Sequence, residues 1–459
     1  MSDNSYIVQR LTNGPKHHLF GFHDLYQTNA DGGFALSLEV EDISHPPLPG
    51  ETCWAGVVCL DGRDFLPIQA THTWNYPQGA RQQWVGESAL FTVNDRDENG
   101  GMIAWICDAS AGKSVGRLSF PVHCLYNAGQ RGLWFNYDRV HACGGYGYNP
   151  IMNRPLCRLD DIPSDDGIWC GDLKTGEKSL LVSIASVASA GETRPVRTGF
   201  PHYLTHLLLN PSGTRIAFLH RYRLMDGGET TRLMSIGIDG SDLRCLAKGF
   251  LSHFTWISDE DIFIWGAHQP QLYGMRESPW LKIPGVLQGA VLAKHMLKTI
   301  RHSSHPCNNG AKNTKQDKFF LVISDSIKPS IRRMGAGVLT EDGHPMSNPL
   351  DRSLMVNDTY PDINGIRHLM LYNVKREWRS DIGSFQMIMK KPDLGMFDWM
   401  TAQAGMDRRV AKKFSRELYM FTRSGLHCDL HPRWSYDGKT VYFDSIHEGT
   451  RQIYYVKIS

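Results

Sequence analysis

The chain ends in the stretch HCDLHPRWSYDGKTVYFDSIHEGTRQIYYVKIS, residues 427–459. Two runs within it, KTVYFDS and RQIYYVKIS, alternate apolar and polar residues as half-buried β-strands do. A turn signal, Ser-Tyr-Asp-Gly at 435–438, precedes the first run, and His-Glu-Gly at 447–449 separates the two runs. Because DLHPRW leads into the first turn, the stretch predicts a meander of three short antiparallel strands.

Similar units recur along the chain, each with an apolar strand, a turn rich in Asp, Asn, Gly or Ser, and a second strand. They lie at 21–40, 82–95, 205–223, 251–266 and 342–362, with a less regular unit at 128–140. Recurrent four-strand meanders of roughly 40–50 residues are typical of β-propellers, whose blades bury their faces only against one another. We therefore predict an all-β fold, a seven-bladed β-propeller, as a single domain over residues 1–459.

Two segments complete this interpretation. SYIVQRL, near the N-terminus, is a strand without a blade of its own, and we expect it to pair with the last blade and close the ring. The range 270–335 lacks the repeat and is predicted to be an insertion in the fifth blade. It contains WLKIPGVLQGAVLAKHMLKTIRH (280–302), whose apolar residues have helical spacing, followed by a polar loop. The sequence leaves open whether this helix packs on the propeller or forms a lid.

The composition excludes several classes of function. The 49 basic and 47 acidic residues nearly balance, which gives no reason to expect nucleic acid or a membrane surface as a partner. No apolar run is long enough to span a bilayer, and MSDNSYIVQR lacks the apolar region of a signal peptide. The ten cysteines form no CxxC pair. We expect a cytoplasmic protein with reduced thiols.

A histidine recurs at one position of the repeat, three residues before the residue that begins each turn phrase. In chain order these positions hold His23, Arg81, His206, His253, His344 and His431, while the unit at 128–140 is too irregular to align. Because the innermost strand of each blade lines the channel of a propeller, corresponding positions form a ring around its axis. A ring of imidazoles suits a divalent metal or acid–base chemistry near neutral pH. The alternative is that each histidine only bonds to neighbouring backbone.

The repeat resembles that of the TolB-like propellers, whose pattern is close to HPxWSPDGxxIxFxSxxxGxxxIY. The last unit matches this pattern at His431, Pro432, Trp434, Ser435, Asp437, Gly438, Phe443, Ser445, Gly449, Ile453 and Tyr454. Within that class the chain resembles the oligogalacturonate lyases and, more loosely, the ulvan lyases. The phrases that carry this resemblance are SHFTW (252–256), DGHP (342–345) and THLLLNPSGTRIAFLHRYR (205–223). Both families are propellers that cleave uronic-acid glycans by β-elimination, so the resemblance implies a lyase with a uronic-acid oligosaccharide as its substrate.

The resemblance also implies a metal site. Oligogalacturonate lyases bind manganese through three histidines and a glutamine, and they use an arginine as base. The matching phrases carry metal ligation to His253 and His344, and the ring position adds His431. The implied cofactor is Mn²⁺, with Zn²⁺ and Ca²⁺ as alternatives. No glutamine lies beside DGHP, so the fourth ligand is open, with Asp429 or His427 as candidates.

β-Elimination needs a charge that stabilises the enolate, a base for the C5 proton and a proton for the departing O4. Arg221 is the counterpart of the lyase arginine, although it could equally form a salt bridge between blades. His206, in the ring position, is the preferred acid or base, and His202 is the second choice. Tyr203 either packs in the structure or binds the substrate.

A second dense stretch, TWNYPQGARQQW (73–84), is predicted to bind substrate. Asn75 and Gln78 can hydrogen-bond to sugar hydroxyls, and Arg81 can hold a carboxylate, as can His23 in the channel. The alternative is an irregular loop whose polar groups bond to backbone. Two further functions stay open: a non-catalytic propeller that binds a glycan or a protein, and a metal-dependent glycan hydrolase.

Overall fold

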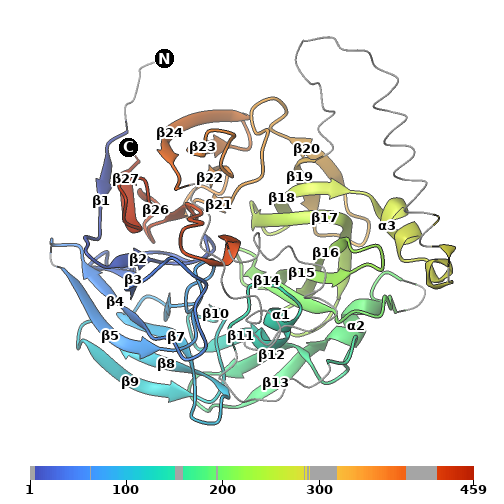
Figure 1. Ribbon diagram of the computed structural model, residues 1–459, viewed down its shortest axis with the longest axis horizontal. Helices are drawn as coiled ribbons and strands as arrows, with labels where there is room; N and C mark the ends of the chain where they lie inside the picture. The colour runs from blue at the N-terminus through green and yellow to red at the C-terminus, as the bar shows by residue number, and fades with distance from the viewer. Residues whose placement is uncertain are drawn as a thin grey trace.

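The computed structural model describes residues 6–62, 64–149, 159–192, 195–283, 285–286, 289, 318–388 and 421–458. In this part of the chain the strands radiate as blades around a central axis (Figure 1). They pair as five four-stranded sheets and one seven-stranded sheet. The seven-stranded sheet is two blades in one, because β17 (Arg244–Trp256) ends the fourth blade and begins the fifth. The predicted seven-bladed β-propeller is confirmed.

The first four blades follow one another along the chain. The first consists of β2 (His17–Leu19), β3 (Phe34–Val40), β4 (Cys53–Cys59) and β5 (Phe65–Thr71). The second consists of β6 (Gln83–Trp84), β7 (Leu90–Arg96), β8 (Met102–Asp108) and β9 (Lys113–Leu118). The third consists of β10 (Cys124–Tyr126), β11 (Arg131–Phe135), β12 (Gly167–Asp172) and β13 (Lys178–Ser183). The fourth consists of β14 (Tyr203–Leu209), β15 (Arg215–Arg223), β16 (Glu229–Gly237) and β17.

The last three blades complete the circle. The fifth adds β18 (Asp261–His268), β19 (Phe319–Ser324) and β20 (Ile331–Met334) to β17. The sixth consists of β21 (Met346–Ser347), β22 (Leu354–Asp358), β23 (Ile366–Asn373) and β24 (Trp378–Gln386). The seventh consists of β25 (Arg433–Trp434), β26 (Thr440–Ser445), β27 (Gln452–Lys457) and β1 (Val8–Arg10). Short helices lie between strands: α1 (Tyr137–Ala142), α2 (Ile184–Ser189), α3 (Pro270–Arg276) and the 3-10 helix η1 (Pro279–Lys282).

The N-terminal strand closes the ring, as the sequence predicts. β1 pairs antiparallel with β27, with Gln9 opposite Tyr455, so the two ends of the chain share the seventh blade (Figure 1). The pairing covers the edge that β27 would otherwise expose.

The insertion in the fifth blade ends earlier than predicted. α3 and η1 follow β18, but β19 and β20 pair as the third and fourth strands of the blade, within the predicted range 270–335. The long stretch of sequence before Phe319, in which an apolar segment and a polar loop follow each other, separates these strands from β18 and makes the repeat hard to recognise. Most of the helix predicted over 280–302 lies outside the described residues.

The tryptophan of the repeated phrase joins neighbouring blades. Its indole N–H donates to a main-chain carbonyl of the preceding blade: Trp84 to Gln27 at 3.2 Å, Trp256 to Leu208 at 3.0 Å, and Trp434 to Met346 at 3.1 Å. All three rings are buried. A large ring with one donor fills the space between blades and satisfies a buried carbonyl at the same time.

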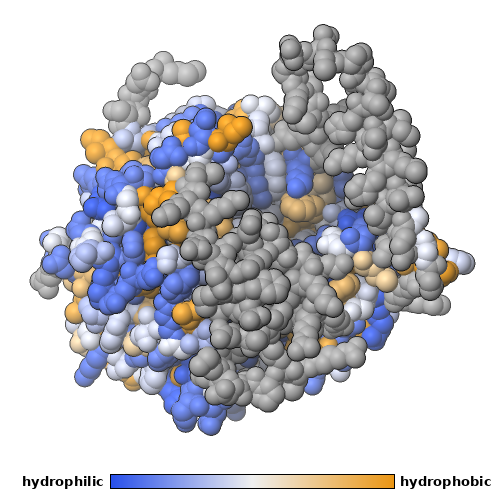
Figure 2. Space-filling view, in the orientation of Figure 1, coloured by the Kyte–Doolittle hydropathy of each residue, from blue (hydrophilic) through white to orange (hydrophobic). Residues whose placement is uncertain are grey.

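Where Figure 2 colours the face seen down the axis, it is mostly hydrophilic, with separate hydrophobic patches. Among the described residues, no helix has the length and apolar character that crossing a membrane requires.

Candidate active site and metal centre

The structure brings the repeated histidines together at the propeller axis. The ring centroids of His253 and His344 lie 4.3 Å apart, as do those of His344 and His431. His23 lies 5.4 Å from His344, and His206 lies 6.4 Å from His253. The predicted ring therefore forms a contiguous imidazole cluster, contributed by the first, fourth, fifth, sixth and seventh blades.

The backbone at these positions is irregular. Arg81, His206 and His431 have φ values of 51°, 59° and 42°, in the left-handed region that residues with a Cβ seldom adopt. His206 and His253 lie where the pairing of β14 and β17 with their neighbours shifts register. Bulges and left-handed residues re-aim side chains and concentrate at functional sites.

Phe22 and His23 cross the axis at the level of this cluster. The Phe22 ring lies 5.1 Å from His206 and 5.5 Å from His431, on opposite sides of the propeller. The crossing requires glycine at position 21, where φ is +130° and a Cβ would lie 2.6 Å from the carbonyl carbon of Gln78.

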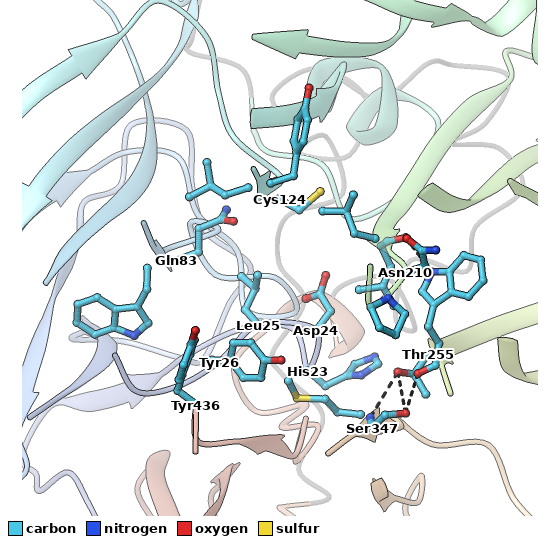
Figure 3. Close-up of a pocket in the computed structure, with 18 of the residues that line it drawn as sticks. His23, Asp24, Leu25, Tyr26, Gln83, Cys124, Asn210, Thr255, Ser347 and Tyr436 are labelled. Atoms are coloured by element: carbon cyan, nitrogen blue, oxygen red, sulfur yellow. Dashed lines mark hydrogen bonds between the residues drawn. The ribbon is translucent and has the colours of Figure 1, made fainter. Parts of the chain in front are cut away.

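A cavity of about 570 Å³ adjoins the cluster at His23 and is lined by residues of all seven blades, Asp24 among them. Figure 3 shows these two side chains in the cavity, with the hydrogen-bonded Thr255 and Ser347 beside them.

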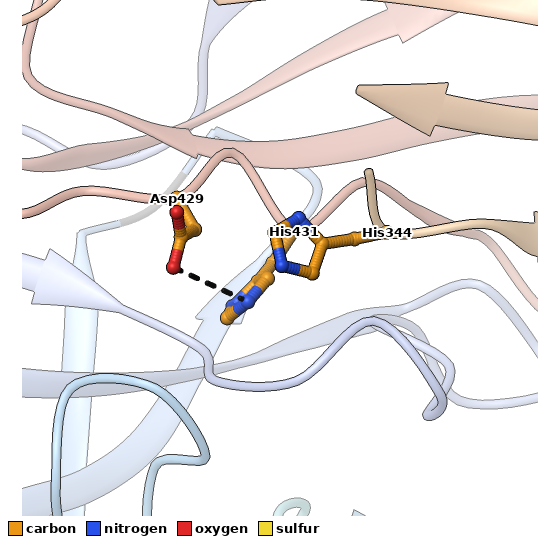
Figure 4. Close-up of side chains that lie close together, drawn as sticks. All are labelled: His344, Asp429 and His431. Atoms are coloured by element: carbon orange, nitrogen blue, oxygen red, sulfur yellow. Dashed lines mark ion pairs between the residues drawn. The ribbon is translucent and has the colours of Figure 1, made fainter. Parts of the chain in front are cut away.

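One subset of the cluster has the geometry of a metal centre. Ligand atoms of His344, Asp429 and His431 all lie within 4.8 Å of one another, and the three residues are buried (Figure 4). Nδ1 of His344 lies 2.8 Å from Asp358 Oδ1, so this nitrogen carries the proton and Nε2 stays available for a ligand bond. Nδ1 of His431 is buried without a hydrogen-bond partner. Two imidazoles and one carboxylate, with an unpartnered buried nitrogen, fit a divalent metal.

The electrostatic surroundings keep His431 neutral and Asp429 ionised, the forms in which these side chains bind a metal. Burial and the charge of His344 hold the pKa of His431 well below its ordinary value, so His431 is neutral. Burial would raise the pKa of Asp429, but His427 and Arg367 outweigh it and hold that pKa well below the ordinary value. At His344 burial opposes protonation, yet Asp358, Asp429 and Asp342 together raise its pKa. A divalent ion would compete with that proton.

His253, predicted to be a metal ligand, lies beside this group but outside it. Its Nδ1 is 3.0 Å from Asp342 Oδ1, and since a carboxylate only accepts, that nitrogen carries the proton. A histidine oriented by a carboxylate in this way presents its other nitrogen for proton transfer. Asp429, two residues before His431 and a candidate for the fourth ligand in the sequence, completes the group of three, and ligation by His253 stays a prediction.

His206 and Arg221 lie together on the fourth blade. Burial, and next the charge of Arg221, hold the pKa of His206 well below its ordinary value, so this imidazole is neutral. Tyr203 and Glu229 outweigh burial and raise the pKa of Arg221, which stays a cation. Tyr203, predicted to bind substrate, is buried opposite Arg221 and donates to Glu229 at 3.1 Å.

His202, the second choice for acid or base, does not reach the cluster. Its Nδ1 lies 3.0 Å from His220 Nε2, and its ring stacks on Tyr222 at 4.3 Å. It directly precedes β14, and its side chain packs against β15 instead of facing the axis. The prediction that His202 lies at the channel mouth is wrong, because its ring is held by His220 and Tyr222 of β15. The irregularity between Thr205 and Leu208 breaks the strand alternation that would otherwise put His202 and His206 on one face.

The stretch 73–84 is occupied by internal contacts. Arg81 forms a bidentate ion pair with Asp24, at 2.8 Å, and its Nε donates to the carbonyl of His123 at 2.9 Å. Asn75 donates to the carbonyl of Gly147 at 2.8 Å, and Gln78 donates to that of Tyr146. These contacts match the alternative interpretation, in which the polar groups of an irregular loop bond to backbone.

The sequence analysis missed one histidine of the repeat and two carboxylates that hydrogen-bond to the clustered histidines. His123 lies three residues before Tyr126, the same spacing as in the other blades, and its Nδ1 contacts the Tyr137 hydroxyl at 3.0 Å. The third blade has no Asp-Gly turn to mark the alignment, but that spacing could have revealed it. Asp342 and Asp358 do not occupy the repeated histidine position, so the spacing of the repeat could not identify them as partners of His253 and His344.

No protein-family model and no curated protein matches this chain. Solved structures do match it. A crystal structure of oligogalacturonate lyase from Vibrio parahaemolyticus matches with a TM-score of 0.56 and 14% identity, over 100% of this chain and 95% of that one. The fold is that of the oligogalacturonate lyases. An oligogalacturonate lyase in complex with manganese matches with a TM-score of 0.54 and 14% identity, over 100% and 94% of the two chains.

A TolB structure from Acinetobacter baumannii also matches, with a TM-score of 0.33 and 11% identity, over 76% of this chain and 63% of that one. The predicted resemblance to the oligogalacturonate lyases is confirmed at the level of the fold. Since one fold hosts many activities, the function has to be argued from the site.

Proposed function

We propose that this protein is a lyase that cleaves uronic-acid oligosaccharides by metal-assisted β-elimination at the imidazole cluster. The observation that carries the proposal is that the group His344, Asp429 and His431 shares one imidazole cluster with the neutral His206. The cationic Arg221 lies next to His206 in this cluster. The likeness in fold to the oligogalacturonate lyases, one of them described in complex with manganese, supports it.

His344, Asp429 and His431 would hold the metal, with Mn²⁺ as the proposed ion. Carboxylate and imidazole ligands together suit Mn²⁺, and Zn²⁺ and Ca²⁺ are the alternatives. When bound, the ion supplies positive charge that stabilises an enolate formed from the uronic carboxylate. The buried Arg221 adds a second fixed charge on the side of His206.

The reaction breaks two bonds and needs no added water. His206, neutral for the reason given above, accepts the C5 proton, and the electron pair of that C–H bond passes into the carboxylate as an enolate. The electron pair then returns to form the C4=C5 double bond as the C4–O4 bond breaks. O4 takes a proton from solvent, or from His253 when both of its ring nitrogens are protonated and Asp342 holds the ring in place.

Ultraviolet absorbance over time tests the proposal. Purified protein with Mn²⁺ and a panel of uronic-acid di- and trisaccharides should give rising absorbance, because elimination creates a conjugated double bond. A flat trace with new reducing ends would indicate the metal-dependent hydrolase. A flat trace without new reducing ends would indicate the binding propeller.

A further inference from the structure

Arg367 is a buried cation at the edge of the metal group. It is the second residue of β23 and is 1% exposed. Its Nη2 lies 2.7 Å from Asp429 Oδ1, and its Nη1 donates to the carbonyl of Thr359 at 3.1 Å. Its guanidinium lies 5.4 Å from the ring centroid of Tyr360. These contacts fix the guanidinium against Asp429.

The two oxygens of Asp429 have different surroundings. Oδ1 lies against Arg367 and, at 3.3 Å, against His427 Nε2. Oδ2 lies 3.8 Å from Nε2 of His431, another member of the metal group. Since a buried carboxylate without a counter-charge is strongly destabilising, the charge of Asp429 needs a cation next to it at all times. Arg367 is in place to supply that cation from one side, and a metal ion from the other.

We propose that Arg367 is a positioning residue that acts as the built-in counter-charge of Asp429. It keeps the carboxylate in place and neutralised whether or not a divalent ion is bound. The proposal rests on the metal centre of the proposed function. Two consequences follow from simple electrostatics. The fold does not depend on the metal, and metal binding is weaker than it would be without Arg367, because two cations share one carboxylate.

The substitution Arg367→Met, which removes the charge and keeps an apolar stem, tests both consequences. Melting temperature and Mn²⁺ affinity are measured on protein freed of metal with a chelator. Without metal, R367M should melt below wild type, because Asp429 loses its permanently charged partner and keeps only His427. The rise in melting temperature on adding Mn²⁺ should be larger in R367M than in wild type. The Mn²⁺ dissociation constant should fall about tenfold, as expected when a like charge a few ångströms away is removed.

A matched control separates this role from that of any buried ion pair. Arg139 pairs with Asp166 at 2.8 Å, with side chains 5% and 15% exposed. Arg139→Met should also lower the melting temperature, but the Mn²⁺-induced rise should equal that of wild type. Arg367→Lys keeps the charge and should respond to Mn²⁺ as wild type does.

A double substitution keeps the proposal testable if R367M does not fold without metal. Replacing both partners, Arg367→Met with Asp429→Asn, removes the unpaired charge and should restore metal-free folding. The proposal is overturned if R367M gains no more from Mn²⁺ than wild type does, or if the double variant is no more stable than R367M. If wild type itself does not respond to Mn²⁺, the metal centre of the proposed function fails, and this proposal fails with it.

Discussion

The indole N–H of Trp256 donates to the carbonyl oxygen of Leu208 at 3.0 Å and joins the fifth blade to the fourth. Trp256→Phe keeps most of the buried ring but leaves that carbonyl without its donor. We expect a loss of about 1–3 kcal/mol in the free energy of unfolding, measured by denaturant titration. Trp378→Phe, at a side chain on β24 that is 46% exposed, is the control and should change little. Equal effects of the two substitutions would contradict the interblade role of the tryptophan.

Arg81 is expected to stabilise the fold rather than bind substrate. Its guanidinium is buried in a bidentate pair with Asp24, so Arg81→Met leaves a carboxylate without its counter-charge. We expect a loss of about 3–5 kcal/mol for this buried pair, measured as unfolding free energy. Arg379→Met, which breaks the more exposed pair with Asp381, should cost at most about 1 kcal/mol. An R81M variant with unchanged stability and a raised KM would show instead that Arg81 binds substrate.

Acid should destabilise the protein through buried neutral histidines. Burial, helped by Arg232 and Arg139, lowers the pKa of His202 to about 3, and burial lowers that of His18 to about 4. The unfolded chain takes up these protons near pH 6.5, so stability is full above that pH and falls as the pH drops towards the folded pKa values.

For His202 alone the loss at about pH 5 is about 2 kcal/mol relative to neutral pH. Unfolding free energies of wild type and His202→Gln at the two pH values check this. The variant should lose less stability on acidification. An identical loss in both proteins would show that His202 is not buried in its neutral form.

Mn²⁺ affinity should distinguish the residues of the metal group from the histidine next to them. His344→Ala and His431→Ala each remove a ligand, so Mn²⁺ affinity by calorimetry should fall more than about 100-fold, beyond the usual effect of an outer partner. His253→Ala should keep the affinity within about tenfold, because His253 lies outside the group. If H253A loses as much affinity as H344A, His253 is a ligand as the sequence predicts, and the metal centre has more members than His344, Asp429 and His431.

The fold was predictable because the repeat is local. The alternating strands, the Asp-Gly turns and the tryptophan all lie within a few residues of one another, and closure by β1 follows from a lone strand in a ring. The limits of the prediction have the same origin. The third blade lacks the turn that marks His123, and the long stretch before Phe319 hides the last two strands of the fifth blade.

The sequence predicted that the repeated histidines meet at the propeller axis, but it did not predict which neighbours they contact. A repeat position gives a place around the axis, so His23, His206, His253, His344 and His431 do meet. The position does not give the partners that set their chemistry, since Asp342 and Asp358 orient histidines through tertiary contacts. Arg81 and His202 show the converse, because both carry suitable chemistry but are held by internal partners.

The central claim is elimination without water at the metal-bearing cluster, and the masses of the products test it most directly. Wild-type protein is incubated with Mn²⁺ and a uronic-acid trisaccharide, and the products are weighed by mass spectrometry. The account predicts that the two product masses sum to that of the substrate, and that His344→Ala abolishes the reaction. Products that together carry one added water for each bond cleaved would contradict the account, as would an intact substrate.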